Sequence, residues 1–152
     1  MRYGISAASI VLKEHKVLLV NHYEPGRYDF WVPPGGSLIG SESIFDCARR
    51  ETFEDTGLVI DLDKIVYIQE FLDQDYHFCK FFDLSTGYRG EVSLRNRLDD
   101  EGFLVDARFL SMHELLELDV KPDILQDQFW VDAARDFPTT RYLGLEVINS
   151  PG

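Results

Sequence analysis

The sequence contains little cysteine and few basic residues, and both shortages restrict its function. Only two of its 152 residues are cysteines, Cys47 and Cys79, and neither belongs to a CxxC pair or has a histidine at metal-ligand spacing. Neither a disulfide framework nor a zinc site is therefore indicated. Lysine and arginine number 15 against 27 aspartates and glutamates, which gives a formal net charge of −12. That acidity argues against a nucleic-acid-binding protein, because such proteins follow the phosphate backbone with basic patches.

Long apolar segments and internal repeats are also missing. The first apolar run is interrupted by Lys13-Glu14-His15-Lys16, a pattern that is not typical of a signal peptide. No other apolar run approaches the length that spans a membrane. We therefore expect a cytoplasmic protein without a membrane partner. With 45% apolar residues, a chain of this length can bury a sizeable core, so residues 1–152 are predicted to form a single domain.

The most informative part of the sequence is the acidic segment, residues 36–58, in which a short helix carries clustered carboxylates. Successive helical residues turn by about 100°, so Glu54 and Asp55 project at about −60° and about +40° from Glu51. Three apolar residues fall in or beside the same arc: Ile44, Cys47 and Ala48. A solvated charged face normally lies opposite the apolar stripe. Carboxylates on a partly buried face repel one another unless a cation lies between them, and oxygen ligands suit a hard cation such as Mg²⁺.

The alternative is an ordinary amphipathic helix whose acids pair with Arg49 and Arg50. The residues before the helix favour a site. Trp31-Val-Pro-Pro-Gly35-Gly36 ends an apolar strand in a rigid turn, and its glycines allow the backbone to approach a ligand closely. A strand, a loop and an acidic helix in this order are suited to holding metal-bound phosphates.

The segment resembles the signature of the Nudix hydrolase family, GX5EX7REUXEEXGU, in which U is a bulky aliphatic residue. Seven positions match at the right spacing: Gly36, Glu42, Arg50, Glu51, Glu54, Gly57 and Leu58. Two positions depart from it. Thr52 replaces an aliphatic residue on the core side, so its hydroxyl needs a partner such as the carbonyl one turn back. Asp55 replaces a glutamate that is a metal ligand in the family, so we expect a weaker metal site or a different preferred metal, with activity retained.

The resemblance implies a fold, a reaction and residue roles. The implied fold is an α/β protein of the Nudix type, an α/β/α sandwich with a mixed β-sheet. The implied reaction is metal-dependent hydrolysis of the pyrophosphate bond in a nucleoside diphosphate linked to another group, with Mg²⁺ or Mn²⁺. Glu42, Glu51, Glu54 and Asp55 would then be the metal ligands. Glu51 would also be catalytic, together with Arg50, which we expect to orient a glutamate through a bidentate pair.

Further candidates lie outside the helix. Many family members place a general base on a loop of variable position, and Glu101, within Asp99-Asp100-Glu101, is the best candidate here; a solvated acidic turn is the alternative. Four residues near the Pro-Gly-Gly turn are candidates for substrate contact: Gly35, Gly36, Arg27 and Tyr28. Six aromatic residues are candidates for stacking on a base, with core packing as the alternative: Tyr23, Tyr28, Phe30, Phe71, Tyr76 and Phe78.

The remaining pattern predicts alternating strands and helices. Strands are expected over residues 5–12, 17–22, 29–32, 65–71, 76–84 and 104–110. The first two are expected to form a hairpin, and so are the strands at 65–71 and 76–84. The helix of the acidic segment is expected to begin at an N-cap, Ser43, and to stop at Gly57.

Two more helices are expected near the C-terminus. A capping box at Ser111 predicts a helix through Leu118, and a second helix is expected from Pro122 to the stop at Pro138. The C-terminal residues Phe129, Trp130 and 141–143 are open to three interpretations: core packing, lining of the substrate site, or a homodimer contact.

Three functions are consistent with these residues. The first is a pyrophosphohydrolase of a small nucleotide such as ADP-ribose, a nucleotide sugar or a nucleoside triphosphate, with ADP-ribose-like substrates favoured because they are common in the family. The second is a non-catalytic, nucleotide-sensing binding module, which Asp55 and Thr52 suggest and the retained Glu51 and Glu54 oppose. The third, removal of 5′ pyrophosphate from RNA, is disfavoured by the acidity of the chain.

Overall fold

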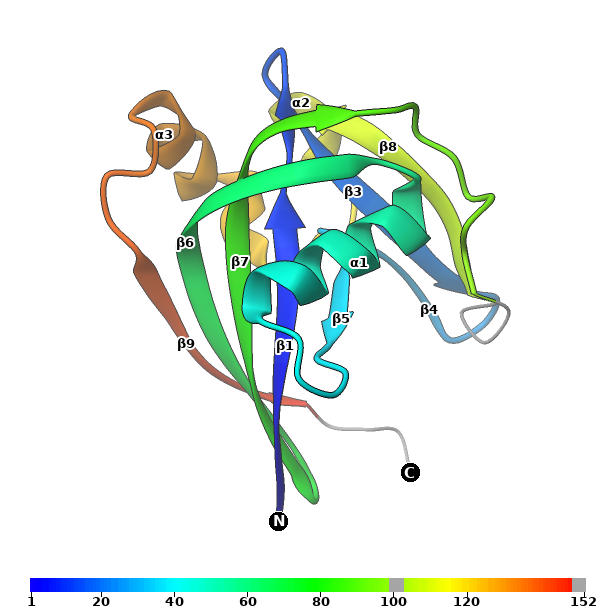
Figure 1. Cartoon of the computed structure of the whole chain (residues 1–152), viewed down its shortest axis with the longest axis vertical. Coiled ribbons are helices and arrows are strands. Elements are labelled where there is room, and N and C mark those ends of the chain that lie inside the picture. Colours follow the sequence, from blue (N-terminus) through cyan, green and yellow to red (C-terminus); the bar gives the residue numbers. More distant parts are fainter. Residues whose placement is uncertain (99–102, 149–152) are drawn as a thin grey trace.

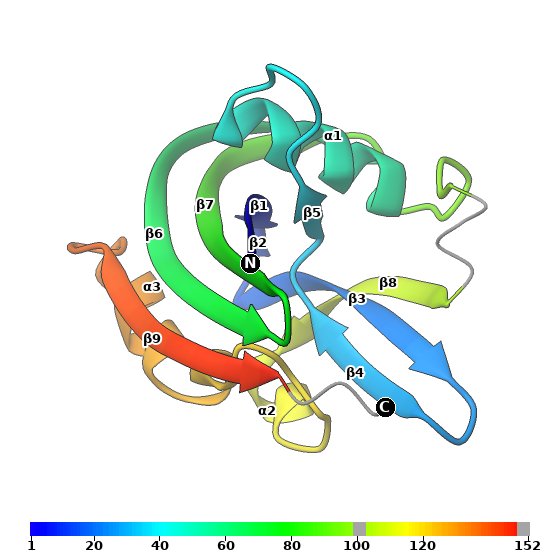
Figure 2. The same cartoon turned by 90° about the horizontal axis from the view of Figure 1, so that it is seen from below.

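The computed structural model describes residues 1–98 and 103–148, which form two β-sheets and four short or medium helices (Figure 1). The first sheet contains β1 (Arg2–Ile10), β5 (Gly35–Ser37), β6 (Val59–Asp73), β7 (Tyr76–Arg89) and β9 (Arg141–Ile148), in the order β5-β1-β7-β6-β9. β1 runs parallel to β7, and β6 runs parallel to β9, whereas the other neighbours are antiparallel. The sheet is therefore mixed. Seen from below, β6 and β7 curve around β1 (Figure 2).

The second sheet is built on β3 (Lys16–Glu24). β4 (Tyr28–Val32) pairs with one edge of β3, and β8 (Leu104–Ser111) also pairs with β3. Both pairs are antiparallel. A short strand, β2 (Leu12–Lys13), pairs with the beginning of β3. The predicted strands at 29–32 and 104–110 are thus confirmed.

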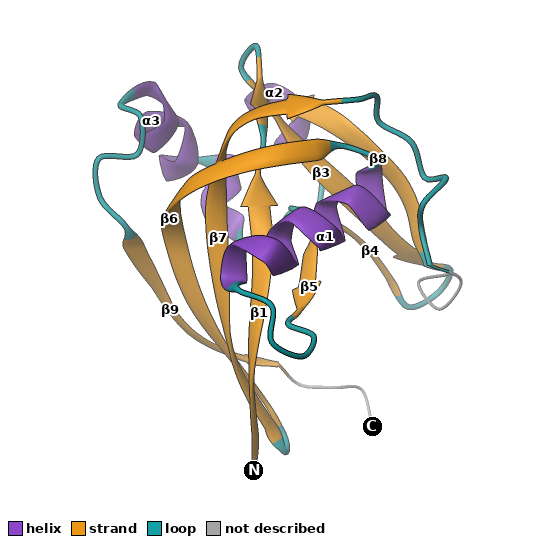
Figure 3. Ribbon diagram, in the orientation of Figure 1, coloured by secondary structure: helices purple, strands orange, loops and turns teal. Residues whose placement is uncertain are grey.

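Helices cover both faces of the first sheet (Figure 3). On β1, Ala7 packs against Cys47 and Ala48 of α1 (Ile44–Thr56). The next residue, Ala8, points to the opposite face, where it belongs to the main hydrophobic cluster with Leu125 and Phe129. Those two come from η2 (Asp123–Gln126) and α3 (Gln128–Ala134), next to α2 (Met112–Leu115). The α/β/α arrangement with a mixed sheet is therefore confirmed.

The caps of α1 explain its bounds. The Ser43 hydroxyl accepts from the Asp46 backbone N–H at 3.0 Å, and the Asp46 carboxylate accepts from the Ser43 N–H at 3.4 Å, which completes a capping box. Gly57 ends the helix in the left-handed conformation with φ of 79°, which costs glycine little. The helix expected between Ser43 and Gly57 is confirmed at both ends.

The predicted hairpin of residues 5–12 and 17–22 is largely wrong. Only β2 pairs with β3, across a turn at Glu14 and His15. β1 instead joins the other sheet, between β5 and β7. The chain crosses between the sheets at Val11, whose carbonyl accepts from the Leu18 N–H at 2.9 Å. β1 can enter the middle of a sheet because its second half is buried on both faces.

The second predicted hairpin is confirmed, but its strands are longer than expected, because β6 begins at Val59 and β7 continues to Arg89. Two strands were not predicted. β5 contains two glycines and only three residues, and β9 pairs with a strand about 75 residues earlier in the sequence. Neither has a local signal that identifies it as a strand.

The C-terminal helices are shorter than predicted. The capping box at Ser111 is present, but α2 ends at Leu115 rather than at 118. The helix expected between Pro122 and Pro138 is divided into η2 and α3 by Asp127, which has a φ of −147°. No helix in the described part of the chain combines the length and the apolar character needed to cross a bilayer.

An ion pair fixes α3 against the first sheet. Arg141 donates to both carboxylate oxygens of Asp132 at 2.8 Å, and the buried Tyr67 hydroxyl donates to the same carboxylate at 2.7 Å. These bonds, the Arg141 pair first among them, lower the pKa of Asp132 to about 2. Phe129 is fully buried in the core. Core packing is therefore the correct interpretation for Phe129, and Arg141 is a structural contact.

Candidate active site

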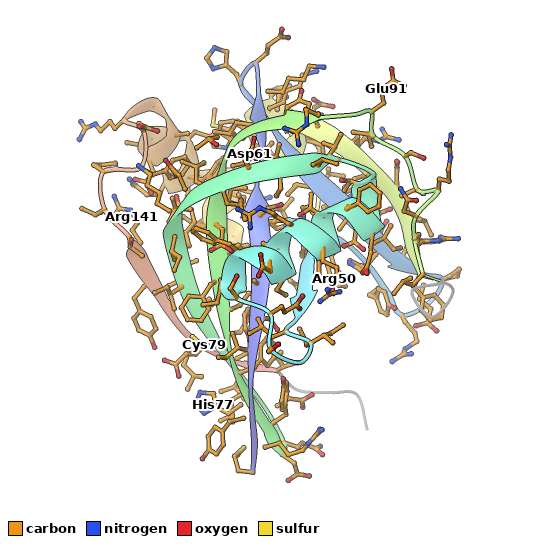
Figure 4. All side chains as sticks on the ribbon, viewed as in Figure 1. Arg50, Asp61, His77, Cys79, Glu91 and Arg141 are labelled. Carbon is orange, nitrogen blue, oxygen red and sulfur yellow. The ribbon has the colours of Figure 1, made fainter. Side chains whose placement is uncertain are left out.

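Arg50 lies on α1 (Figure 4). It bonds three carboxylates of the acidic segment. Its Nε and Nη2 donate to the two oxygens of Glu42 at 3.1 and 2.7 Å, as a bidentate pair. Nη1 donates to Glu51 at 2.9 Å and to Glu54 at 3.3 Å. Nη2 also reaches the Ser37 carbonyl at 3.1 Å. The predicted bidentate pair of Arg50 with a glutamate is present, and its partner is Glu42.

Glu42 is the most firmly held carboxylate. Besides the two bonds from Arg50, its Oε1 accepts from the Ile39 backbone N–H at 2.8 Å. The Arg50 bonds, ahead of the Ile39 bond, lower the pKa of Glu42 to about 2. Glu42 therefore anchors both the loop before α1 and the guanidinium that bonds the other acids. Its proposed place among the metal ligands stays a prediction.

The two glycines of β5 bring the sheet against the site. A Cβ atom on Gly36 would lie 2.5 Å from Oε1 of Glu51, and one on Gly35 would lie 2.4 Å from the Ala7 carbonyl. Both are far below an ordinary contact distance. The close approach that these glycines permit is thus to Glu51 and to β1. Their contact with substrate stays a prediction.

The helical arc predicted for the acids is confirmed. Glu51 is 7% exposed and Asp55 is 2% exposed, on the same side of α1 as the buried Cys47 and Ala48. Glu54 is half-buried beside them. The alternative of acids paired with arginines is also partly realised, because Glu51 and Glu54 pair with Arg50. The burial of two carboxylates nevertheless separates this face from a solvated one.

The donor set of the acidic segment suits a hard divalent cation. Among residues 1–98 and 103–148, no three His, Cys, Asp or Glu side chains are arranged as a metal site. Two positive charges nevertheless lie near four carboxylates: Arg50 pairs with Glu42, Glu51 and Glu54, and the charges of Glu51 and Asp55 act on Lys80. Oxygen-only ligands with excess negative charge match Mg²⁺ or Mn²⁺. Glu51, Glu54 and Asp55 would hold the ion. The two glutamates are less tightly bound than Glu42, because each accepts from Arg50 through Nη1 alone.

Thr52 finds a different partner from the one expected. Its hydroxyl lies 2.6 Å from the Ser9 hydroxyl of β1, and both residues are fully buried. The expected bond to a carbonyl one turn back is made by Thr56 instead, to the Thr52 carbonyl at 2.7 Å. The departure from the family pattern at Thr52 is therefore compensated by a serine on the sheet, which ties α1 to β1.

This hydroxyl pair leads to a stability prediction. The Thr52→Val variant is expected to lower the free energy of unfolding by about 1–2 kcal/mol, because it leaves the buried Ser9 hydroxyl without a partner. The Ser9→Ala/Thr52→Val double variant is expected to recover most of that loss. Urea unfolding of the wild type, both single variants and the double variant measures the coupling. Additive losses in the double variant would contradict it.

A cavity of about 620 Å³ lies on the face of the first sheet opposite α1. Phe78, Phe71 and Glu146 face each other across β7, β6 and β9 and form one row of its wall. Phe71 and Phe78 are stacked, with ring centres 4.9 Å apart. The remaining aromatic lining residues are Tyr28, Phe30 and Phe82. Flat, parallel rings of this kind provide surfaces for stacking a base.

The candidates Arg27 and Tyr28 both line this cavity. Arg27 is exposed, pairs with Glu24 at 2.9 Å and lies 5.9 Å from the Tyr28 ring centre. Sequence reasoning did not identify Lys80, Gln69 and Lys121, which supply polar groups to the same cavity. For Lys80 and Gln69 a signal existed in the alternation of the predicted strands. Glu101, the candidate general base, lies outside the described residues.

Comparisons with known proteins agree with this geometry. Residues 2–128 match the NUDIX domain family. No curated protein matches the sequence. The solution structure of the ORF135 protein of E. coli has a TM-score of 0.71 and 18% identity, covering 91% of this chain and 96% of that one. The Mutator MutT protein from Bacillus halodurans has a TM-score of 0.69 and 21% identity, covering 96% and 90%.

An ADP-ribose pyrophosphatase from Streptococcus suis has a TM-score of 0.62 and 17% identity, covering 94% of this chain and 98% of that one. At these identities the structural similarity concerns the fold. The family match covers most of the chain and includes all the residues on which the resemblance depended. The chain therefore belongs to the Nudix family of pyrophosphohydrolases.

Proposed function

We propose that this protein hydrolyses the pyrophosphate bond of a small nucleotide, with Mg²⁺ or Mn²⁺ as cofactor. The observation that carries the proposal is the position of α1. It brings Glu51, Glu54 and Asp55 into one arc, and the charges of Glu51 and Asp55 act on Lys80, which lines the aromatic cavity. A nucleoside diphosphate carries a charged diphosphate at one end and a flat base at the other, and these two surfaces would accept them separately.

Arg50 and Glu51 have different roles in the proposed reaction. The protein contributes in-line positioning and neutralisation of charge to diphosphate hydrolysis, because its side chains have little covalent chemistry to perform. A bound divalent ion neutralises phosphate charge and lowers the pKa of a water molecule. Arg50 holds Glu42, Glu51 and Glu54 in fixed directions, so the carboxylates need little reorganisation. Glu51, held against Gly36 and bonded by Arg50, is our candidate to accept a proton from the attacking water.

The dimensions of the cavity support a nucleotide of ordinary size. A volume of about 620 Å³ lies within the range of about 300–1,000 Å³ that is typical of small-ligand sites. Stacking against Phe71 and Phe78 would hold the base, and the cations Arg27, Lys80 and Lys121 would favour the phosphates. ADP-ribose, a nucleotide sugar or a nucleoside triphosphate would satisfy these requirements. We favour ADP-ribose-like substrates, which an S. suis protein of the same fold hydrolyses according to its name.

A turnover panel tests the proposal. Phosphate or nucleotide release would be measured with ADP-ribose, nucleotide sugars and nucleoside triphosphates, in the presence of Mg²⁺ or Mn²⁺ and with a chelator. We expect turnover of one substrate class that the chelator abolishes. The absence of turnover, with nucleotide binding retained, would instead support a nucleotide-sensing module. The homodimer and the cytoplasmic location stay predictions from the sequence.

A further inference from the structure

Lys80 connects the cavity to the carboxylates of α1. It lies on β7, where it pairs with Gln69 of β6 and Ser6 of β1. Strand alternation places its side chain on the same face as Phe78 and Phe82, and all three line the cavity. Its Nζ lies 5.3 Å from the centre of the Phe82 ring. The same ammonium is close enough to Asp55 and Glu51 for their charges to raise its pKa.

The Lys80 ammonium lies beside an aromatic ring rather than in direct contact with a carboxylate. Among the described residues, it makes no hydrogen bond or ion pair, and its contact is with the Phe82 ring. Burial lowers the pKa of Lys80 to about 8, against the opposing effect of the two carboxylates. The group is therefore mainly protonated at neutral pH, with N–H donors directed to a cavity that could accept a ligand.

Arg50, by contrast, has no donor to offer a substrate. Its guanidinium bonds Glu42, Glu51, Glu54 and the Ser37 carbonyl. A phosphate could reach it only by displacing one of these partners. The other cations of the cavity have different neighbours, since Arg27 pairs with Glu24 and Lys121 lies 5.0 Å from the Phe30 ring centre. Lys80 is the cavity cation that the acids of α1 influence.

We propose that the Lys80 ammonium binds the diphosphate of the substrate and, in the free protein, partly neutralises the carboxylates of α1. The inference rests on the proposed function. A divalent ion held by the carboxylates would repel the ammonium, and the phosphate oxygens of a substrate would attract it. Lys80 would thus hold the diphosphate between the ion and the stacked base.

Two measurements on Lys80→Gln test this role, because they are expected to change in opposite directions. kcat/KM for the preferred substrate is expected to fall by about 10- to 100-fold, the loss typical of one charged hydrogen bond. The affinity for Mn²⁺ without nucleotide, measured by calorimetry, is expected to rise at least about threefold, because a positive charge near the carboxylates is removed. Damage to the structure would weaken both. Lys80→Arg keeps the charge and is expected to recover much of the loss in kcat/KM.

Lys13→Gln is the matched control. Lys13 also lies over an aromatic ring, with Nζ 5.7 Å from the centre of Phe109, but it is exposed and does not line the cavity. It is expected to leave both quantities unchanged. Unchanged kcat/KM in Lys80→Gln, or weaker Mn²⁺ binding, would overturn the inference. If the wild type hydrolyses no nucleotide, the proposed function fails. The affinity for ADP in the presence of Mn²⁺ then tests whether Lys80 binds a diphosphate. Equal ADP affinity in the wild type and in Lys80→Gln would contradict that role.

Discussion

The Glu54→Gln variant is expected to lower kcat by about 10²- to 10⁴-fold while the protein remains folded. Glu54 is half-buried and meets Arg50 through a single nitrogen at 3.3 Å, so a neutral amide can occupy its place with little strain. The amide has the same shape but no charge, and it is a poor ligand for Mg²⁺ or Mn²⁺. Loss of several kcal/mol of charge stabilisation in the transition state corresponds to a loss of this size.

The measurement is steady-state turnover of the substrate that the panel identifies, together with a Mn²⁺ titration of the same preparation. Glu117→Gln is a suitable control, because Glu117 is an exposed glutamate outside both the acidic segment and the cavity. Weaker Mn²⁺ binding with unchanged thermal stability would assign Glu54 to the metal site. Undiminished turnover in Glu54→Gln would remove it from the proposed ligands.

The Asp83→Asn variant is expected to change the pH dependence of stability more than any other single substitution in the sheet. Asp83 lies on β7 and is fully buried, and neither of its carboxylate oxygens has a hydrogen-bond partner among the described residues. It pairs with Ser9 of β1, whose hydroxyl contacts Thr52, so the carboxyl faces α1. Burial raises the pKa of Asp83 to about 7, and the positive charge of Arg49 only partly opposes this shift.

The direction of the effect follows from the raised pKa. The folded protein binds the Asp83 proton more tightly than the unfolded chain does, so the free energy of unfolding falls as the pH rises from about 4 to about 7 and levels off above that. Asparagine cannot ionise and lacks this dependence. The stability of Asp83→Asn relative to the wild type is therefore expected to increase by about 2–3 kcal/mol between pH 5 and pH 8.

Urea unfolding at several pH values between 5 and 8 measures this difference. Asp61→Asn provides a control, because Asp61 is an exposed residue of β6 paired with Arg89 at 3.6 Å, and its replacement should leave the pH dependence of the wild type in place. Parallel stability curves for the wild type and Asp83→Asn would show that Asp83 is already ionised in the folded protein at pH 5.

Local rules in the sequence determined the bounds of α1 and the arrangement of its acids. The N-cap at Ser43, the stop at Gly57 and the helical period act over a few residues, so they operate regardless of the surrounding fold. The hairpin of β6 and β7 was also predictable, because its strands are adjacent in the sequence. The family was predictable as well, because the seven residues that match the Nudix signature lie within 23 residues of the chain.

The tertiary structure decided the partners of these elements. β1 leaves its sequence neighbour β3 and pairs with β7, more than 65 residues away, and β9 adds to β6 at a similar separation. Parallel pairs of this kind have no local sequence signal, because their register depends on burial of both faces. The same pairing determines which side chains meet. It places Ser9 against Thr52, buries Asp83 beneath α1, and directs Lys80 into the aromatic cavity. The sequence alone did not predict any of these three contacts, because each depends on the pairing of distant strands.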